Sequence, residues 1–93
     1  MNDAEKHNEV TLVFEPQSGG SVPEREPKTN TLRQFVLAVF QRLRVGNPAN
    51  PTVQRVGHPG VLNLDATVES LGLHDGTKLN LAWQASGGSG NRP

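Results

Sequence analysis

Alternating apolar and other residues predict two strands, one near each end of the chain. The first, residues 9–15, has apolar side chains at every second position: Val10, Leu12 and Phe14. The second, residues 77–83, repeats the pattern with Leu79, Leu81 and Trp83. A period of two is typical of strands that bury one face. Both segments are therefore expected to lie at the centre of a sheet.

A longer period predicts a helix in the middle of the chain. Its apolar side chains fall at positions i, i+3, i+4, i+7, i+8 and i+11: Leu32, Phe35, Val36, Val39, Phe40 and Leu43. This spacing aligns them along one side of an α-helix. The residues that can supply the N-cap oxygen are Thr29, Asn30 and Thr31. Gly46 and Pro48 are expected to end the helix, whose apolar side should face the sheet.

Shorter elements are expected around these three. Residues 21–26 contain Pro23, which lacks the amide hydrogen that a central strand needs, so they predict an edge strand. Residues 46–51 have prolines at intervals and predict a loop. The elements expected after this loop are short strands at residues 52–56 and 61–64 and a helical turn at residues 67–71.

One long helix and several strands define an α+β domain. A single helix can cover one face of a sheet, so the economical arrangement is a mixed sheet of four to five strands packed on it. This layout is the β-grasp. The domain is expected to span residues 9–84, after a disordered lead-in at 1–8 and before a flexible C-terminal tail at 85–93.

The composition argues against several classes of function. The 93 residues include nine Lys or Arg and nine Asp or Glu, which are scattered, so neither nucleic acid nor a membrane surface is an expected partner. Without cysteine there is no thiol nucleophile, disulfide or thiolate metal ligand. His7, His58 and His74 lie far apart, so no metal or other cofactor is expected. No Ser, His and Asp are placed together, and the chain is not expected to be an enzyme.

The tail contains the most specific functional pattern. Gly87 and Gly88 follow the last predicted strand closely, and a peptide with two adjacent glycines can enter a narrow channel that any Cβ would block. Two interpretations stay open, an acyl handle for a partner enzyme or an ordinary linker.

The polar N-terminus and the lack of a long apolar run favour a cytoplasmic protein, with the nucleus left open.

Residues 67–83, TVESLGLHDGTKLNLAW, resemble the short helix and last strand of the ubiquitin superfamily. The matching positions are Thr67, Leu71, Leu73, Leu79 and Leu81. Gly87 and Gly88 fall at the spacing of the ubiquitin diglycine, although Gln84 and Ser86 replace its preceding basic residues. The chain is more similar to the ubiquitin-fold modifier, which shares Ser-Val-Pro-Glu, here residues 21–24. That modifier also has a helix pattern like the one at Val36, Leu37 and Phe40.

This resemblance implies a ubiquitin-like protein modifier that is cut after Gly88 and joined through it to target lysines. Gly87, which also has no side chain, would precede Gly88 in the channel of the partner enzyme. Activating, conjugating and processing enzymes would be the partners, and they would supply every nucleophile. The alternatives are a ubiquitin-like domain that binds proteins without conjugation, and a sulfur carrier or accessory subunit of a multicomponent enzyme. The chain is expected to act as a monomer.

A second candidate site is expected on the sheet surface. Val56, His58 and Ala82 occupy positions resembling the apolar patch through which ubiquitin-like domains contact partners. The alternative for Val56 is that it packs inward.

The lysines that could accept a further modifier unit are Lys6, Lys28 and Lys78. Their alternative interpretation is as ordinary solvated side chains.

Overall fold

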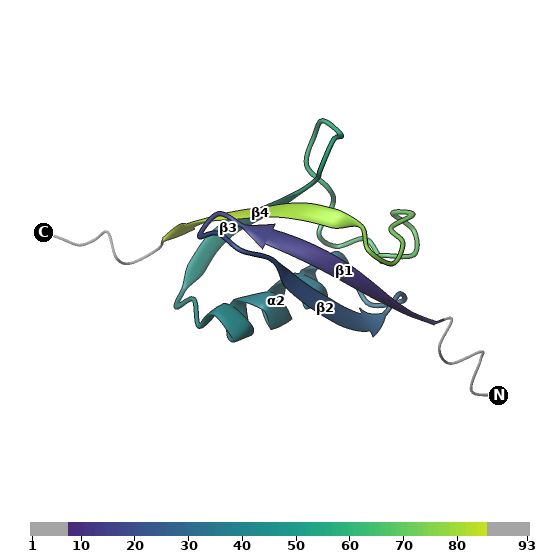
Figure 1. The fold of residues 1–93 in the computed structure, drawn as a ribbon, viewed down its shortest axis with the longest axis horizontal. Helices are drawn as coiled ribbons and strands as arrows, with labels where there is room; N and C mark the ends of the chain where they lie inside the picture. The colour runs from purple at the N-terminus through teal and green to yellow at the C-terminus, as the bar shows by residue number, and fades with distance from the viewer. Residues whose placement is uncertain (1–7, 86–93) are drawn as a thin grey trace, which may run out of the picture.

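Four strands and one helix make up the structure, a computed structural model that describes residues 8–85 (Figure 1). The elements in chain order are β1 (Glu9–Pro16), β2 (Val22–Pro27), α2 (Leu32–Leu43), β3 (Pro48–Arg55) and β4 (Lys78–Ala85). Within these residues the sheet has four strands, the lower of the two numbers expected from the sequence. No helix among them is long and apolar enough to cross a membrane.

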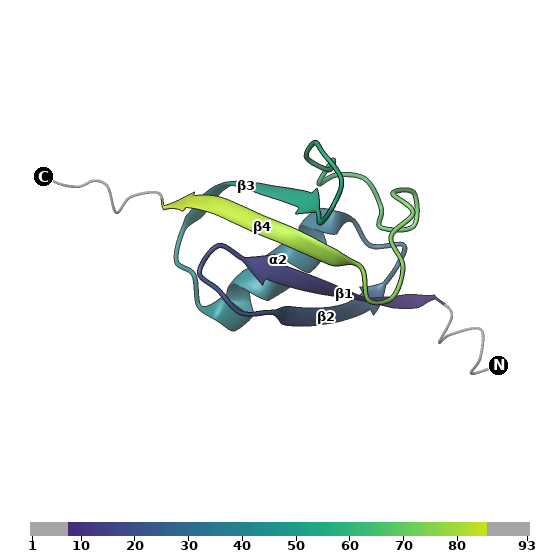
Figure 2. The same ribbon diagram turned by 45° about the horizontal axis from the view of Figure 1, so that its top comes forward.

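The strands lie in the order β2-β1-β4-β3. The central pair, β1 and β4, is parallel, and each outer strand is antiparallel to its neighbour. Figure 2 shows α2 behind this sheet, so that the opposite face is turned to solvent. The two strands predicted from alternating residues are therefore central, and the strand containing Pro23 lies at an edge, as predicted.

Helix α2 begins after one of the predicted N-cap residues, Thr31, but it ends earlier than the sequence predicts. The Thr31 hydroxyl accepts the N–H of Gln34 at 3.3 Å, and Gln34 Oε1 accepts the N–H of Thr31 at 2.8 Å. This reciprocal capping box satisfies two amides that the first turn would leave unpaired. At the other end Arg44, rather than Gly46, ends the helix, because its φ of 57° turns the backbone into the left-handed region.

We expect Thr31→Ala to lower the free energy of unfolding by about 1 kcal/mol, because it removes the acceptor of the Gln34 amide. Urea unfolding followed by circular dichroism measures the change. Thr29→Ala is the matched control, since Thr29 is an exposed threonine just ahead of the cap, and it should cost less than about 0.5 kcal/mol. Equal losses in the two variants would contradict the capping role of Thr31.

The core lies between α2 and the covered face of the sheet. Its fully or almost fully buried side chains are Val10, Leu12, Phe14, Leu32, Phe35, Val36, Val39, Phe40, Val53, Val68, Leu73, Leu79 and Leu81. They include every apolar position that defines the predicted helix except Leu43, which is partly buried and packs against this core. The apolar residues of β1 and of β4 thus meet the apolar side of α2, which explains why one helix suffices.

The loop predicted at residues 46–51 is wrong in part, because β3 already begins at Pro48. Pro48 pairs with Ala85 and Ala49 with Gln84, so the prolines do not prevent pairing at this sheet edge. The register then shifts between Ala49 and Thr52. A bulge of this kind bends an edge strand and leaves residues unpaired. The predicted strand at 52–56 is therefore the second half of a longer, bulged one.

The strand predicted at residues 61–64 is also wrong. Leu62 donates its N–H to the Val53 carbonyl at 2.8 Å, but these residues form no strand. Leu62 and Leu64 instead pack their side chains against the core from an irregular segment. At residues 67–71 the chain makes a turn in which the Leu71 N–H donates to the Thr67 carbonyl at 3.1 Å.

Candidate functional site

The C-terminal end of β4 is fixed on the β1 side by a residue outside the strands. Pairing between β1 and β4 ends with Pro16 opposite Leu81. Gln17 continues it, since its backbone N–H donates to the Leu81 carbonyl at 2.9 Å and its Oε1 accepts the Trp83 N–H at 2.8 Å. The Gln17 side chain therefore acts as acceptor where β1 has already turned away.

On the β3 side, Asn50 Nδ2 donates to Gln84 Oε1 at 2.9 Å. Below the sheet the Trp83 ring meets Phe40 of α2 edge-on, with ring centroids 5.2 Å apart.

Ala85, which the sequence placed in the flexible tail, belongs to β4. That part of the prediction is wrong, because pairing with the unforeseen start of β3 extends the strand.

Gly87 and Gly88, the predicted processing and conjugation residues, lie outside the described residues, as do Lys6 and His7. Gly88 follows the end of β4 by three positions in the sequence. The candidate roles of the two glycines stay predictions, and so does the flexibility expected for the tail.

Val56 and His58 lie in a loop that follows β3 and projects from the body (Figure 1). Val56 is 42% exposed, so the alternative that it packs inward is wrong. The loop is ordered by two bonds of 3.0 Å, from Gln54 Nε2 to the His58 carbonyl and from the His58 N–H to the Arg55 carbonyl. Val61, 67% exposed, adds a second apolar side chain that no sequence pattern had indicated as a contact.

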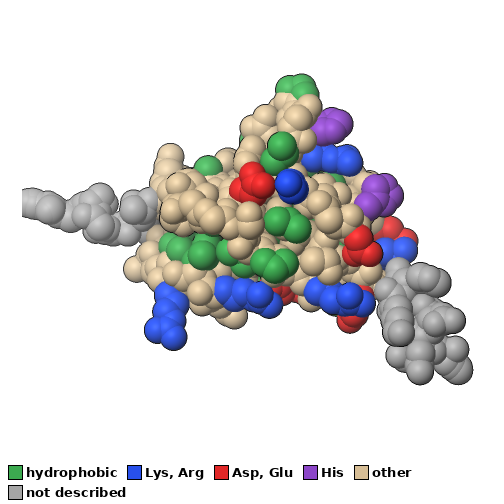
Figure 3. Space-filling model, viewed as in Figure 1, with side chains coloured by type: hydrophobic (Ala, Val, Ile, Leu, Met, Phe, Trp, Pro, Cys, Tyr) green, Lys and Arg blue, Asp and Glu red, His purple; other side chains and the backbone are tan. Residues whose placement is uncertain are grey.

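Ala82 lies on the exposed face of the sheet, but apart from this loop. The Val56 N–H donates to the carbonyl of Lys78, which is four residues from Ala82, or about 13 Å along a strand. The exposed polar pair Asn80 and Gln54 lies between them. In Figure 3, hydrophobic side chains likewise form separate areas divided by polar atoms. Val56 and His58 thus lie in one loop, whereas Ala82 lies apart from it.

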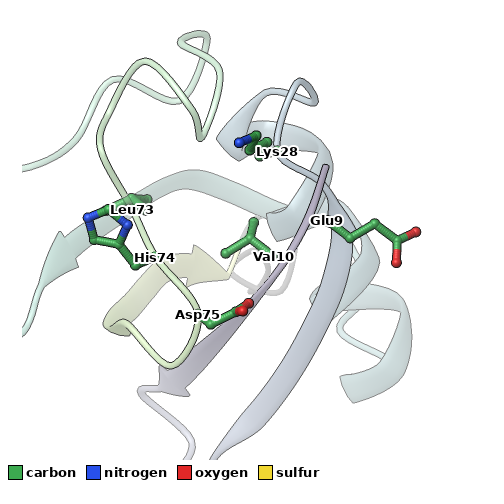
Figure 4. A pocket seen from close by; sticks show the side chains of 6 residues that line it. All are labelled: Glu9, Val10, Lys28, Leu73, His74 and Asp75. Carbon is green, nitrogen blue, oxygen red and sulfur yellow. The ribbon is translucent and has the colours of Figure 1, made fainter. Parts of the chain in front are cut away.

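A shallow pocket of about 150 Å³ lies near the start of β1 and collects several ionisable side chains (Figure 4). Its lining residues are Glu9, Val10, Lys28, Leu73, His74 and Asp75. Both carboxylates have structural partners: Asp75 Oδ1 accepts the Thr11 N–H at 2.7 Å, and Glu9 Oε1 accepts from Arg25 Nε at 2.8 Å. Figure 4 shows the Glu9 side chain directed away from the pocket. Across residues 8–85 no group of three His, Asp or Glu side chains could hold a metal ion.

Glu24 is a buried carboxylate on the covered side of β2, with 6% of its surface exposed. Arg42 Nε lies 3.1 Å from Glu24 Oε1, within ion-pair distance but not aligned for a hydrogen bond, and Arg42 Nη1 donates to the Pro23 carbonyl. Burial raises the pKa of Glu24 to about 7; a bond to Glu26 adds to the shift and Arg42 opposes it. No pattern in the sequence distinguishes this glutamate from its exposed neighbours.

Elsewhere on the surface, ion pairs involve exposed groups. Arg33 Nε donates to Asp65 Oδ1 at 2.9 Å and fastens α2 to the segment that follows β3. The hydrogen bond and the charge of Arg33 lower the pKa of the Asp65 carboxyl. Such solvent-exposed pairs contribute little to stability.

No family model and no curated protein matches the chain. Solved structures do match it. One, described as molecular mimicry of SUMO that promotes DNA repair, has a TM-score of 0.70 and 15% identity over 81% of this chain and 91% of that one. A de novo design based on ubiquitin has a TM-score of 0.70 and 17% identity over 90% and 98%. This chain has the ubiquitin-like β-grasp fold.

A third ubiquitin-like structure, ubiquitin from Caldiarchaeum subterraneum, has a TM-score of 0.62 and 21% identity over 85% of this chain and 98% of that one. The predicted fold class and the resemblance to ubiquitin-like proteins are thereby confirmed at the level of the fold. Identities of 15% to 21% do not separate the branches of ubiquitin-like proteins. The closer similarity to the ubiquitin-fold modifier stays a prediction.

Proposed function

We propose that this chain is a ubiquitin-like protein modifier, released at Gly88 and joined through it to lysines of target proteins. The observation that carries the proposal is the end of β4. This central strand of a ubiquitin-like fold ends at Ala85, three positions before Gly88. A diglycine that follows an ordered strand so closely suits a narrow channel in a partner enzyme, because glycine has no Cβ to obstruct it.

In the proposed chemistry the catalytic groups belong to partner enzymes. A processing protease hydrolyses the peptide bond between Gly88 and Ser89 with one water, which leaves a carboxylate on Gly88. An activating enzyme joins this carboxylate to the AMP part of ATP and releases pyrophosphate. A partner's cysteine thiolate then displaces AMP to form a thioester, and a target lysine amine displaces the thiol to form an isopeptide bond. The chain supplies the acyl group, which fits its lack of cysteine.

The projecting loop supports a second candidate function, a domain that binds partners without being conjugated. Val56 and Val61 are both strongly exposed, and apolar side chains on an ordered loop are suitable anchors for a protein interface. In the modifier the same loop would contact the partner enzymes. The two candidates therefore differ in the fate of Gly88 and not in the use of this loop.

Incubation of the full chain with a lysate of its source cells and ATP, followed by intact-mass measurement, tests the proposal. We expect loss of residues 89–93 and new covalent conjugates, while Gly88→Ala stays uncut and unconjugated because its Cβ obstructs the channel. Gly90→Ala, two positions beyond the cut, is the matched control and should behave as wild type. A wild-type chain that keeps its last residues and forms no conjugate would refute the modifier function, and a thiocarboxylate mass would identify a sulfur carrier.

A further inference from the structure

The last residues of β4 extend beyond the strand that pairs with them on one side. Pairing with β1 ends at Leu81, and Pro16 has no N–H to donate. From there Gln17 contacts β4 at two points, with its backbone N–H on the Leu81 carbonyl and its Oε1 on the Trp83 N–H. Without this side chain the Trp83 amide would lose its acceptor in the protein.

The opposite side is closed by the bulge of β3. Asn50 has a φ of 51°, in the left-handed region that asparagine tolerates better than most residues. In this conformation its Nδ2 donates to Gln84 Oε1 at 2.9 Å. Backbone pairing of Ala49 with Gln84 continues on the same side. The two residues before Ala85 each accept or donate a hydrogen bond with an amide side chain, that of Gln17 from the turn after β1 and that of Asn50 from the bulge of β3.

We propose that Gln17 and Asn50 form an exit clamp, positioning residues that fix the direction in which the chain leaves the sheet at Ala85. This inference rests on the proposed function, in which a partner enzyme must receive Gly88 in a narrow channel. When the clamp is closed, the last residues of β4 are held in one orientation. When it opens, they keep their pairing with β3 but sample more orientations, so a smaller fraction of molecules presents Gly88 as the enzyme accepts it.

The experiment compares three glutamine variants of the full chain. Gln17→Ala removes the acceptor of the Trp83 N–H and is expected to speed hydrogen exchange at that amide about fivefold. Cleavage after Gly88 and conjugation in the lysate assay should slow about threefold or more, while the variant stays folded. Gln17→Glu keeps a carboxylate oxygen that can accept the same N–H, so it should restore slow exchange and the wild-type rate.

Gln34→Ala is the matched control. Gln34 Oε1 also accepts a backbone N–H at 2.8 Å, that of Thr31, but at the start of α2. Its loss should leave both the exchange of the Trp83 amide and the processing rate unchanged. Asn50→Ala tests the other half of the clamp and should slow processing as Gln17→Ala does.

If the wild type is processed normally, either of two results would contradict the exit clamp. One is unchanged exchange of the Trp83 amide in Gln17→Ala, and the other is faster exchange with an unchanged processing rate. A wild-type chain that is never cut would instead refute the proposed function, and the positioning role with it. That outcome is read from the wild type alone, so the two failures are distinguishable.

Discussion

Phe35→Ala should lower the free energy of unfolding by about 3 to 5 kcal/mol. Phe35 is fully buried on the side of α2 that packs against the sheet. The substitution removes the aromatic ring from close-packed surroundings that relax only partly, so burial is lost and a cavity is left behind. Native domains have about 5 to 15 kcal/mol of stability in total, so this one substitution removes a large share of it.

Urea unfolding followed by the fluorescence of Trp83, the single tryptophan, measures this effect. Leu37→Ala is the matched control, because Leu37 lies on the same helix but is 51% exposed. It should cost less than about 1 kcal/mol. Similar losses in the two variants would mean that α2 packs on the sheet through a different side from the one described.

Three of the elements, β1, β4 and α2, could be predicted from the sequence because the pattern of buried residues determines them. Residues of β1 and β4 alternate between core and solvent, and those of α2 return to the core every three or four positions. Local capping then fixes the start of the helix at Thr31. These constraints act within a few residues, so the pattern contains them without knowledge of the partner elements.

Elements that depend on distant partners could not be predicted in the same way. Pro48 and Asn50 are turn-forming residues by local preference, yet pairing with the end of β4 places them in a bulged edge strand. Leu62 and Leu64 have the spacing of a strand, but they pack on the core from an irregular segment. The spacing of apolar side chains indicates which residues are buried, but it does not indicate which backbone groups are paired.

The same distinction applies to the candidate site, of which one part is evident in the local sequence and another depends on residues that are distant in the sequence. Gly87 and Gly88 are evident in the sequence because glycine is informative by itself. Gln17 and its partner Trp83 are 66 positions apart, and nothing in their local sequence links them. The predicted patch separates because the register of β3 and β4 inserts Gln54 and Asn80 between Ala82 and the loop. Only the folded chain brings these relationships into view.

Glu24 should make the stability of the fold depend on pH. Its pKa of about 7 in the folded chain lies above its ordinary value of 4.5, so the folded state holds this proton more tightly than the unfolded state does. The groups facing it are Arg42 from α2 and Glu26 on its own strand, and burial outweighs the attraction of Arg42. The stabilising contribution is therefore fully present below about pH 4.5 and is lost as the pH rises through about 7.

We expect Glu24→Gln to remove this dependence and to be more stable than wild type by up to about 3 kcal/mol above pH 8, because its amide resembles the protonated carboxyl. Urea unfolding of both proteins between pH 4 and pH 8.5 measures the difference, which should vanish at the acidic end. Glu9→Gln is the matched control, since Glu9 is an exposed glutamate on the adjacent strand and its variant should keep the wild-type slope. Wild-type stability that stays level between pH 5 and pH 8.5, together with a Glu24→Gln variant that is less stable than wild type, would mean that Glu24 is ionised and stabilised by Arg42 throughout this range.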